Sequence, residues 1–425
     1  MRVRTLLLYL IGHRQAILDI ASDRRSLFLG FLFVLSAGFA REYDGADLVH
    51  EPWHLAIPFG ASLATSFLLF CLTYGSAEGK TMQAPPFFSS YRVFLGLFWM
   101  TAPLAWLYAI PYERFLGPVE ATSANLWTLG LVAFWRVVLM IRVLSVLMGY
   151  RHVAAIFFVM ALADVEALLG LCLSPIPLIE VMGGIHGSAS ETLRKSMAKD
   201  LCFLGTCSLP FWVIGAFIAG VKSCPRWQGP PTAVSQSHTW SWPLGGLVFT
   251  SIAIWFLFLP FTQPEQQLRN RVERGLKEGR IAEALAEMSA HYPSGFPPHW
   301  DPPPKLALGQ REPPLVDVME VIADSPPTPW VRSIFIEKFE RYLARYPIGE
   351  REAKLLLRLP EGKALVKALI AARGELRYVN ELLEEVVEKL GLDDQMPATS
   401  KRARDKLAEK TRIENEKQKT DDQNE

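Results

Sequence analysis

The sequence predicts an all-α protein in which a polytopic helical membrane domain of six to seven transmembrane helices is followed by a soluble helical C-terminal region. The first observation behind this prediction is the distribution of charge. Residues 1–262 contain 17 Lys+Arg and 14 Asp+Glu, whereas residues 263–425 contain 27 and 29. The second is a series of apolar segments in the first part that show no polar face at helical spacing. Lipid is therefore the expected solvent of the first part, and water that of the second.

The N-terminal segment, residues 1–25, is expected to form an amphipathic helix at the membrane surface. Its apolar run, 6–11, is short and is followed by His13 and Arg14. No small-residue cleavage site comes after it, so the pattern differs from that of a cleaved signal peptide. We expect the first spanning segment to direct insertion and the N-terminal helix to rest among the headgroups.

The transmembrane domain, residues 26–262, contains seven apolar segments. About 20 apolar residues are needed to cross the hydrocarbon core, and most of the segments approach or exceed this length. Trp and Tyr residues gather at the segment ends, as expected at the two membrane–water interfaces. The segments are 26–40, 53–74, 93–110, 125–147, 153–179, 201–221 and 242–262.

Lys and Arg residues in the short flanks predict how the chain lies in a bacterial cell inner membrane. The five Arg residues near the start favour a cytoplasmic N-terminus. The basic residues of 269–280 favour a cytoplasmic C-terminus, and two cytoplasmic ends require an even number of crossings. Segment 153–179 would supply this by entering and leaving on one side, because Asp164 and Glu166 lie in its middle and two prolines near its end. The alternative is seven full crossings and an exported C-terminal region.

The soluble region, residues 263–394, is expected to contain short helices and a stiff proline-rich linker at 293–304. The tail, 395–425, has many charges and few large apolar residues, which predicts disorder. Short helices on a proline tether suit docking better than catalysis. We therefore expect residues 264–394 to bind a protein partner.

The sharpest motif is His-Glu-Pro-Trp-His at residues 50–54. In zinc proteases two His residues four positions apart share a helix face, and the Glu polarises a metal-bound water. Here His50, Glu51 and His54 would be the catalytic or metal-binding residues. Pro52 argues against this, since a helix would have to begin at the motif and leave His50 outside. The other interpretations are a metal or proton-sensing site without catalysis, and an interfacial loop. Two carboxylates stand near enough in sequence to join such a site: Asp44 and Asp47.

A second constellation consists of charges inside apolar segments. Arg136 lies 14 residues before the turn near Tyr150, and Asp164 lies 14 residues after it. In an antiparallel hairpin the two side chains would share one depth and could pair, with Glu166 close by. An unpaired charge at mid-membrane costs on the order of several kcal/mol. The pair is interpreted either as a structural salt bridge or as part of an ion, proton or substrate pathway.

No cofactor is predicted. The Gly-rich stretch 183–187 lacks the Lys of a phosphate-binding loop, and the five cysteines show no paired spacing. The basic residues of 269–280 alternate with acidic ones beside the membrane, so they favour contact with anionic lipid over nucleic acid. The expected partners are the lipid bilayer and a protein. A small-molecule substrate cannot be named, and the chain is expected not to be an enzyme.

The sequence Arg-Gln-Ala-Ile-Leu-Asp-Ile at 14–20 resembles the amphipathic entry of Yip1-like five-span membrane domains. The layout of the first five segments, over about residues 5–175, resembles that family too. The resemblance implies membrane organisation or trafficking-like roles without catalysis. The charged residues of segments four and five, and the two later spans, depart from it. Beyond this layout the chain is similar to uncharacterised multi-pass proteins of bacterial inner membranes.

The leading hypothesis is accordingly a non-enzymatic membrane scaffold or organiser whose cytoplasmic helical region binds a partner. The first alternative is a transporter or ion-coupled protein that uses Arg136, Asp164 and Glu166. The second is a membrane metalloenzyme at His50, Glu51 and His54.

Overall fold

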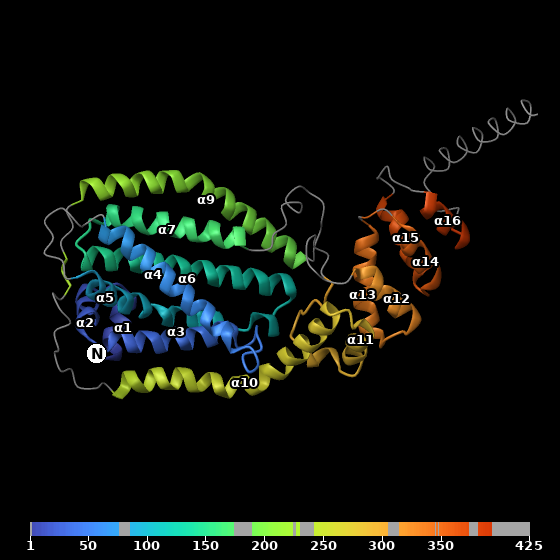
Figure 1. The fold of residues 1–425 in the computed structure, drawn as a ribbon, viewed down its shortest axis with the longest axis horizontal. Helices are drawn as coiled ribbons and strands as arrows, with labels where there is room; N and C mark the ends of the chain where they lie inside the picture. Colours follow the sequence, from blue (N-terminus) through green and yellow to red (C-terminus); the bar gives the residue numbers. More distant parts are fainter. Residues whose placement is uncertain are drawn as a thin grey trace, which may run out of the picture. The chain divides into compact units, whose positions relative to one another are not determined.

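A computed structural model shows an all-helical chain (Figure 1). Among the described residues, six helices are long and apolar enough to cross a membrane, which confirms the predicted fold class. The chain divides into a membrane unit and a C-terminal unit. The membrane unit comprises Met1–Leu178, His186–Asn270 and Ser294–Trp300, and the C-terminal unit comprises Ile179–Ile185, Arg271–Pro293 and Asp301–Glu425. The structure describes residues 2–75, 86–173, 189–223, 227–229, 242–304, 314–344, 346, 348–373 and 381–392.

The membrane-spanning candidates follow the predicted apolar segments. They are Pro52–Tyr74 (η1, Pro52–Leu55, and α4, Ala56–Gly75), Phe87–Arg114 (α5, Phe87–Trp99; η2, Ala102–Ala109; η3, Tyr112–Arg114), Pro118–Leu147 (α6), His152–Leu171 (α7, His152–Leu173), Ala189–Lys222 (α9) and Trp242–Lys277 (α10). Helix α3, Ser26–Glu42, is equally apolar and has 17 residues. At 1.5 Å per residue this is about 26 Å, close to the thickness of the hydrocarbon core.

Helices α3 and α10 run parallel, side by side (Figure 1). The hydroxyl of Ser36 donates to the carbonyl of Ser251, and the hydroxyl of Thr262 donates to the carbonyl of Tyr43. Residue numbers therefore increase in the same direction along the two helices. Thr262 of α10 therefore lies at the end of the bundle where α3 ends, which is opposite to the end where α3 begins.

Helix α7 is continuous from His152 to Leu173 and packs antiparallel to α9 (Figure 1). The rings of Phe157 and Trp212 have centroids 5.8 Å apart, and further along Asp164 accepts a hydrogen bond from Ser208. The expected broken helix that enters and leaves on one side is therefore not found in α7. The prolines that suggested it come after the helix, and residues 174–188 lie outside the described part of the chain.

The N-terminal segment forms two helices, α1 (Val3–Leu10) and α2 (Arg14–Ser22), where one was expected. One face of each helix is buried against the bundle, and the opposite face is exposed. The fully buried side chains include Tyr9, Ile17 and Ile20. Their apolar face thus joins the main core of the membrane unit.

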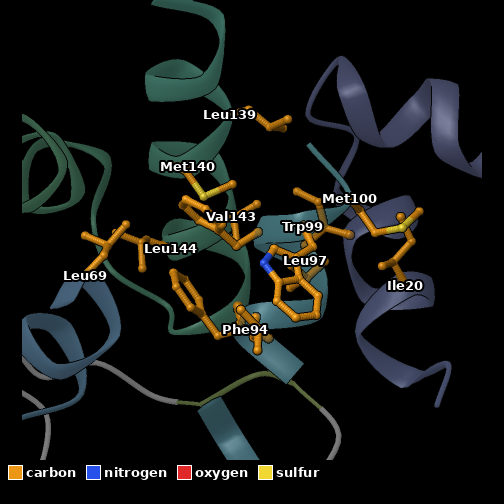
Figure 2. Packing of buried hydrophobic residues seen from close by; sticks show 14 of the residues in the cluster. Ile20, Leu69, Phe94, Leu97, Trp99, Met100, Leu139, Met140, Val143 and Leu144 are labelled. Atoms are coloured by element: carbon orange, nitrogen blue, oxygen red, sulfur yellow. The ribbon is translucent and has the colours of Figure 1, made fainter. Parts of the chain in front are cut away.

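The core of the membrane unit lies where α2, α4, α5 and α6 meet (Figure 2). Aromatic and branched side chains from these helices interlock there. The side chains labelled in the view are Ile20, Leu69, Phe94, Leu97, Trp99, Met100, Leu139, Met140, Val143 and Leu144. This packing joins the first helices to the middle of the domain.

In the described part of the C-terminal unit, the chain forms these amphipathic helices: α11 (Ile281–Ser289), α12 (Leu315–Asp324), α13 (Pro329–Leu343), α14 (Glu350–Arg358), α15 (Gly362–Arg373) and α16 (Glu381–Lys389). Each contributes side chains that are almost fully buried, among them Met288, Met319, Phe335, Leu356 and Val366. The helices thus enclose an apolar interior of their own.

The proline-rich stretch 293–304, predicted to be a stiff linker, makes packing contacts. In the membrane unit the rings of Phe296 and Trp300 stack with centroids 4.6 Å apart. In the C-terminal unit the Nζ of the buried Lys338 lies 2.7 Å from the carboxylate of Asp301. The stretch is held because its aromatic and acidic residues find partners that a count of prolines does not reveal. The predicted disordered tail, 395–425, lies outside the described residues.

Candidate functional site

Arg136 lies on α6, with its guanidinium carbon 5.1 Å from the centroid of the Phe98 ring. A cation over an aromatic face is attracted by the ring quadrupole. The ionisable groups that act on it electrostatically are the carboxylate of Glu166 and the hydroxyls of Tyr9 and Tyr108. Helices α1, α5, α6 and α7 and the 3-10 turn η2 thus contribute to one intramembrane polar cluster.

Asp164 has a different partner from the one that equal depth suggested. It accepts a hydrogen bond from the hydroxyl of Ser208 on α9, and Glu166 is hydrogen bonded by the side chain of Thr65 on α4. Positions 164 and 166 are two residues apart on α7, which turns them about 200° from one another around the helix axis, so the two carboxylates point in roughly opposite directions. Among the described residues no nitrogen of Arg136 lies within ion-pair distance of either carboxylate. The expected pair of Arg136 with Asp164 is therefore replaced by a longer-range interaction with Glu166.

The His-Glu-Pro-Trp-His motif forms two separate acid–histidine pairs. The Nδ1 of His50 lies 2.9 Å from the buried carboxylate of Asp47, and the Nε2 of His54 lies 3.1 Å from Glu51. The 3-10 turn η1 begins at Pro52, so the two His residues do not share a helix face. Within the described ranges no group of three or more His, Cys, Asp or Glu side chains is placed to hold a metal ion.

Asp44 was the other carboxylate near enough in sequence to join a site at the motif. It belongs instead to an ionic network that the sequence did not reveal. The guanidinium of Arg114 lies 2.5 Å from Asp44 and 2.8 Å from Glu265. The amide of Gln266 donates to the carbonyl of Asp44 at 2.7 Å. The network fastens the loop after α3 and the turn η3 to the end of α10.

The same loop is held by the polar turn of α10. The amide of Gln263 donates to the carbonyls of Tyr43 and Ala46 at 3.2 and 3.0 Å, and its oxygen accepts from the backbone N–H of Val49 at 3.2 Å. Thr262 also donates to the carbonyl of Tyr43, at 2.6 Å. Side chains of one helix thus satisfy backbone groups that irregular structure would otherwise leave unpaired. The run Thr-Gln-Pro-Glu-Gln directly after an apolar span was the available signal.

The Tyr43 ring completes this junction. Its hydroxyl donates to the carbonyl of Ala109 at 2.9 Å. Burial, and secondarily the charge of Asp44, raise the pKa of Tyr43 to about 12. The hydroxyl is therefore protonated at neutral pH and acts as a donor.

Within the bundle, Ser36 on α3 is fully buried and joins three helical elements. Its oxygen accepts from the indole N–H of Trp106 at 3.2 Å and from that of Trp255 at 3.1 Å. It donates to the carbonyl of Ser251 at 3.2 Å. The hydroxyl therefore uses its donor and both acceptor positions, and it ties α3 to η2 and to α10.

No family model, curated protein or solved structure matches this chain. The Yip1-like layout and the bacterial origin accordingly stay predictions.

Proposed function

We propose that the chain is a non-enzymatic membrane scaffold that holds a helical region for docking a protein partner. The observation that supports this best is the use of polar groups in the membrane unit. Ser36, Asp164 and Arg114 all tie helices to one another through direct bonds. Such groups fix a rigid anchor, whereas a transport path or reaction centre needs polar groups left available to a ligand.

The C-terminal unit supports the docking part of the proposal. Its helices have their own apolar interior, so their outer faces can be used for contact without loss of the fold. Ion pairs reinforce this frame, since Arg351 on α14 binds Asp317 and Glu320 on α12. The remaining outer positions, such as Lys354 and Lys363, are exposed.

The experiment is photo-crosslinking of the full chain in its native membrane. A photoreactive residue replaces Lys354 or Lys363 on the C-terminal unit, and Lys222 at the end of α9 serves as the exposed control. We expect a discrete protein adduct from the first two positions and none from the control. Absence of an adduct at both C-terminal positions, with the chain correctly inserted, would reject a protein scaffold.

The sidedness that we propose differs from two cytoplasmic ends. Since α10 runs parallel to α3, the chain leaves the membrane unit on the side opposite to the N-terminal helices. The concentration of Arg before α3 favours a cytoplasmic N-terminus. The docking region then faces away from the cytoplasm, which long domains can do whatever their charge. Fusion of alkaline phosphatase to the C-terminus should be active and fusion of a cytoplasm-dependent fluorescent protein dark. The reverse pattern would overturn this orientation.

A second candidate function, ion-coupled transport, is favoured by Arg136 alone. Its guanidinium sits over an aromatic ring with Glu166 as the acting carboxylate, and this differs from a closed salt bridge. If the cluster carries ions, Glu166→Gln should abolish a pH-dependent flux in proteoliposomes, whereas Asp164→Asn should leave it. No flux from the unchanged chain, or a flux that Glu166→Gln leaves unchanged, would remove transport through this cluster from consideration.

A further inference from the structure

The helices α1 and α2 are fastened to the bundle through their inner side. The indole N–H of Trp135 donates to the carbonyl of Leu10 at 2.9 Å. The Nε of Arg142 donates to the carbonyl of Gly12 at 3.1 Å. These donors on α6 satisfy carbonyls at the end of α1, where helix geometry leaves them without an intrahelical partner. The two helices are thus a fixed part of the membrane unit.

The outer side of α1 combines apolar and basic residues. Leu7 and Ile11 are 60% and 71% exposed. Arg4 is also exposed and lies three residues before Leu7, so all three residues share a face opposite the buried Leu6 and Tyr9. Helix α1 has no acidic residue in its first turn.

This surface lies at one end of the bundle. Arg142, which holds Gly12, is in the last turns of α6, and its guanidinium reaches the ring of His152 at the start of α7. In Figure 1 α1 and α2 lie at the end of the bundle where α6 stops and α7 begins. The ends of spanning helices mark the headgroup level of a bilayer.

We propose that α1 and α2 form a binding surface for anionic phospholipids. Leu7 and Ile11 enter the acyl-chain boundary, and the arginines contact the phosphates above it. The segment is well supplied for this role, since its five arginines exceed its two aspartates: Arg2, Arg4, Arg14, Arg24 and Arg25 against Asp19 and Asp23. An amphipathic helix with this division of residues binds an interface through buried apolar area together with attraction to anionic lipid.

A bilayer fits the surface better than a protein or nucleic acid does. Exposed Leu and Ile side chains lie beside arginines at the level where acyl chains meet headgroups. A nucleic acid would bind the arginines but would make no favourable contact with the exposed Leu and Ile side chains. Each arginine close to an anionic surface adds attraction that falls off within a Debye length. The proposal stands on this surface alone and does not depend on the scaffold function.

The test uses the purified full chain in a neutral detergent, titrated with phosphatidylglycerol or phosphatidylcholine and followed by native mass spectrometry. We expect phosphatidylglycerol to bind more tightly to the unchanged chain. The variant Arg2→Gln/Arg4→Gln should lose roughly 10- to 30-fold in affinity for it, and less at high salt. The matched control is Arg194→Gln/Lys199→Gln, which removes two exposed charges at the start of α9.

Two further double variants complete the test. Arg2→Lys/Arg4→Lys retains the charge and should retain most of the preference, which also separates charge loss from misfolding. Leu7→Ser/Ile11→Ser should weaken both lipids alike, because it removes apolar contact. Equal binding of the two lipids by the unchanged chain, or an equal loss in the control variant, would overturn the proposal.

Discussion

Replacement of Ser36 by Ala tests whether the buried hydroxyl ties the bundle together. The change removes the acceptor for two indole N–H groups and the donor to the carbonyl of Ser251. Interhelical hydrogen bonds in membrane proteins contribute about 0.6 kcal/mol on average and about 1.7 kcal/mol at most. Three such bonds give a loss of about 2 kcal/mol, with an upper bound of about 5 kcal/mol.

The matched control is Ser62→Ala on α4. Ser62 accepts from the indole N–H of Trp99 at 3.1 Å, and its own proton goes to the nearby carbonyl of Phe59 in the same helix. The substitution therefore removes one interhelical bond and should cost about 0.6 kcal/mol. The loss of unfolding free energy should therefore be about three times larger for Ser36→Ala than for Ser62→Ala. This ratio separates the loss of three interhelical bonds from a general effect of removing a serine.

The assay is reversible unfolding of the purified full chain in mixed micelles of dodecyl sulfate and a neutral detergent, followed by far-ultraviolet circular dichroism. Ser36→Ala should shift the midpoint to lower dodecyl sulfate mole fraction by about three times the shift of Ser62→Ala. Ser36→Thr, which keeps the hydroxyl, should recover part of the loss. A Ser36→Ala variant as stable as the unchanged chain, or no less stable than the control, would refute the reasoning.

Three further substitutions test other contacts. Gly215→Ala should cost about 1–3 kcal/mol in the same assay, because an added Cβ on α9 would overlap the ring of Phe157. Lys338→Met should cost about 1–3 kcal/mol, since it leaves carbonyls of the proline-rich stretch without their donor and Asp301 without its cation, and hydrogen exchange of α13 amides should rise. Gln263→Leu should free the loop after α3, and faster proteolysis there, with helicity unchanged, is the expected result. An unchanged unfolding midpoint for Gly215→Ala, unchanged midpoint and hydrogen exchange for Lys338→Met, and unchanged proteolysis for Gln263→Leu would each contradict the corresponding prediction.

Composition was enough to predict the membrane domain and the helical region after it. The apolar length of the segments sets where helices cross, since lipid requires every backbone group to be bonded internally. The partner of each charged side chain within the membrane domain was predicted less well. Counting from the turn gave Arg136 and Asp164 the same depth, but depth says nothing about direction around the axis. Asp164 turns to α9, and Glu166 turns to Thr65 on α4.

The loop between α3 and α4 marks a second limit. His50 and His54 stood out as a motif, yet each is paired with the acidic residue three positions earlier. Pro52 indicated that a helix would begin at the motif and leave His50 outside it, and the turn η1 does begin at Pro52. The Gln263 contacts could not be foreseen, because they join residues more than 200 positions apart. Such pairings depend on which helices become neighbours, and a single sequence does not encode that in a local pattern.

The partners of Ser36 have a consequence for biosynthesis. Trp255 lies 219 residues after Ser36 in the chain, so the last span is made long after the first has been threaded into the bilayer. Until then the hydroxyl lacks two of its three partners, Trp255 and Ser251, and the nascent protein stays an incomplete assembly. A product that ends before α10 would leave the buried Ser36 hydroxyl with Trp106 as its remaining interhelical partner, and α3 without the helix that runs beside it.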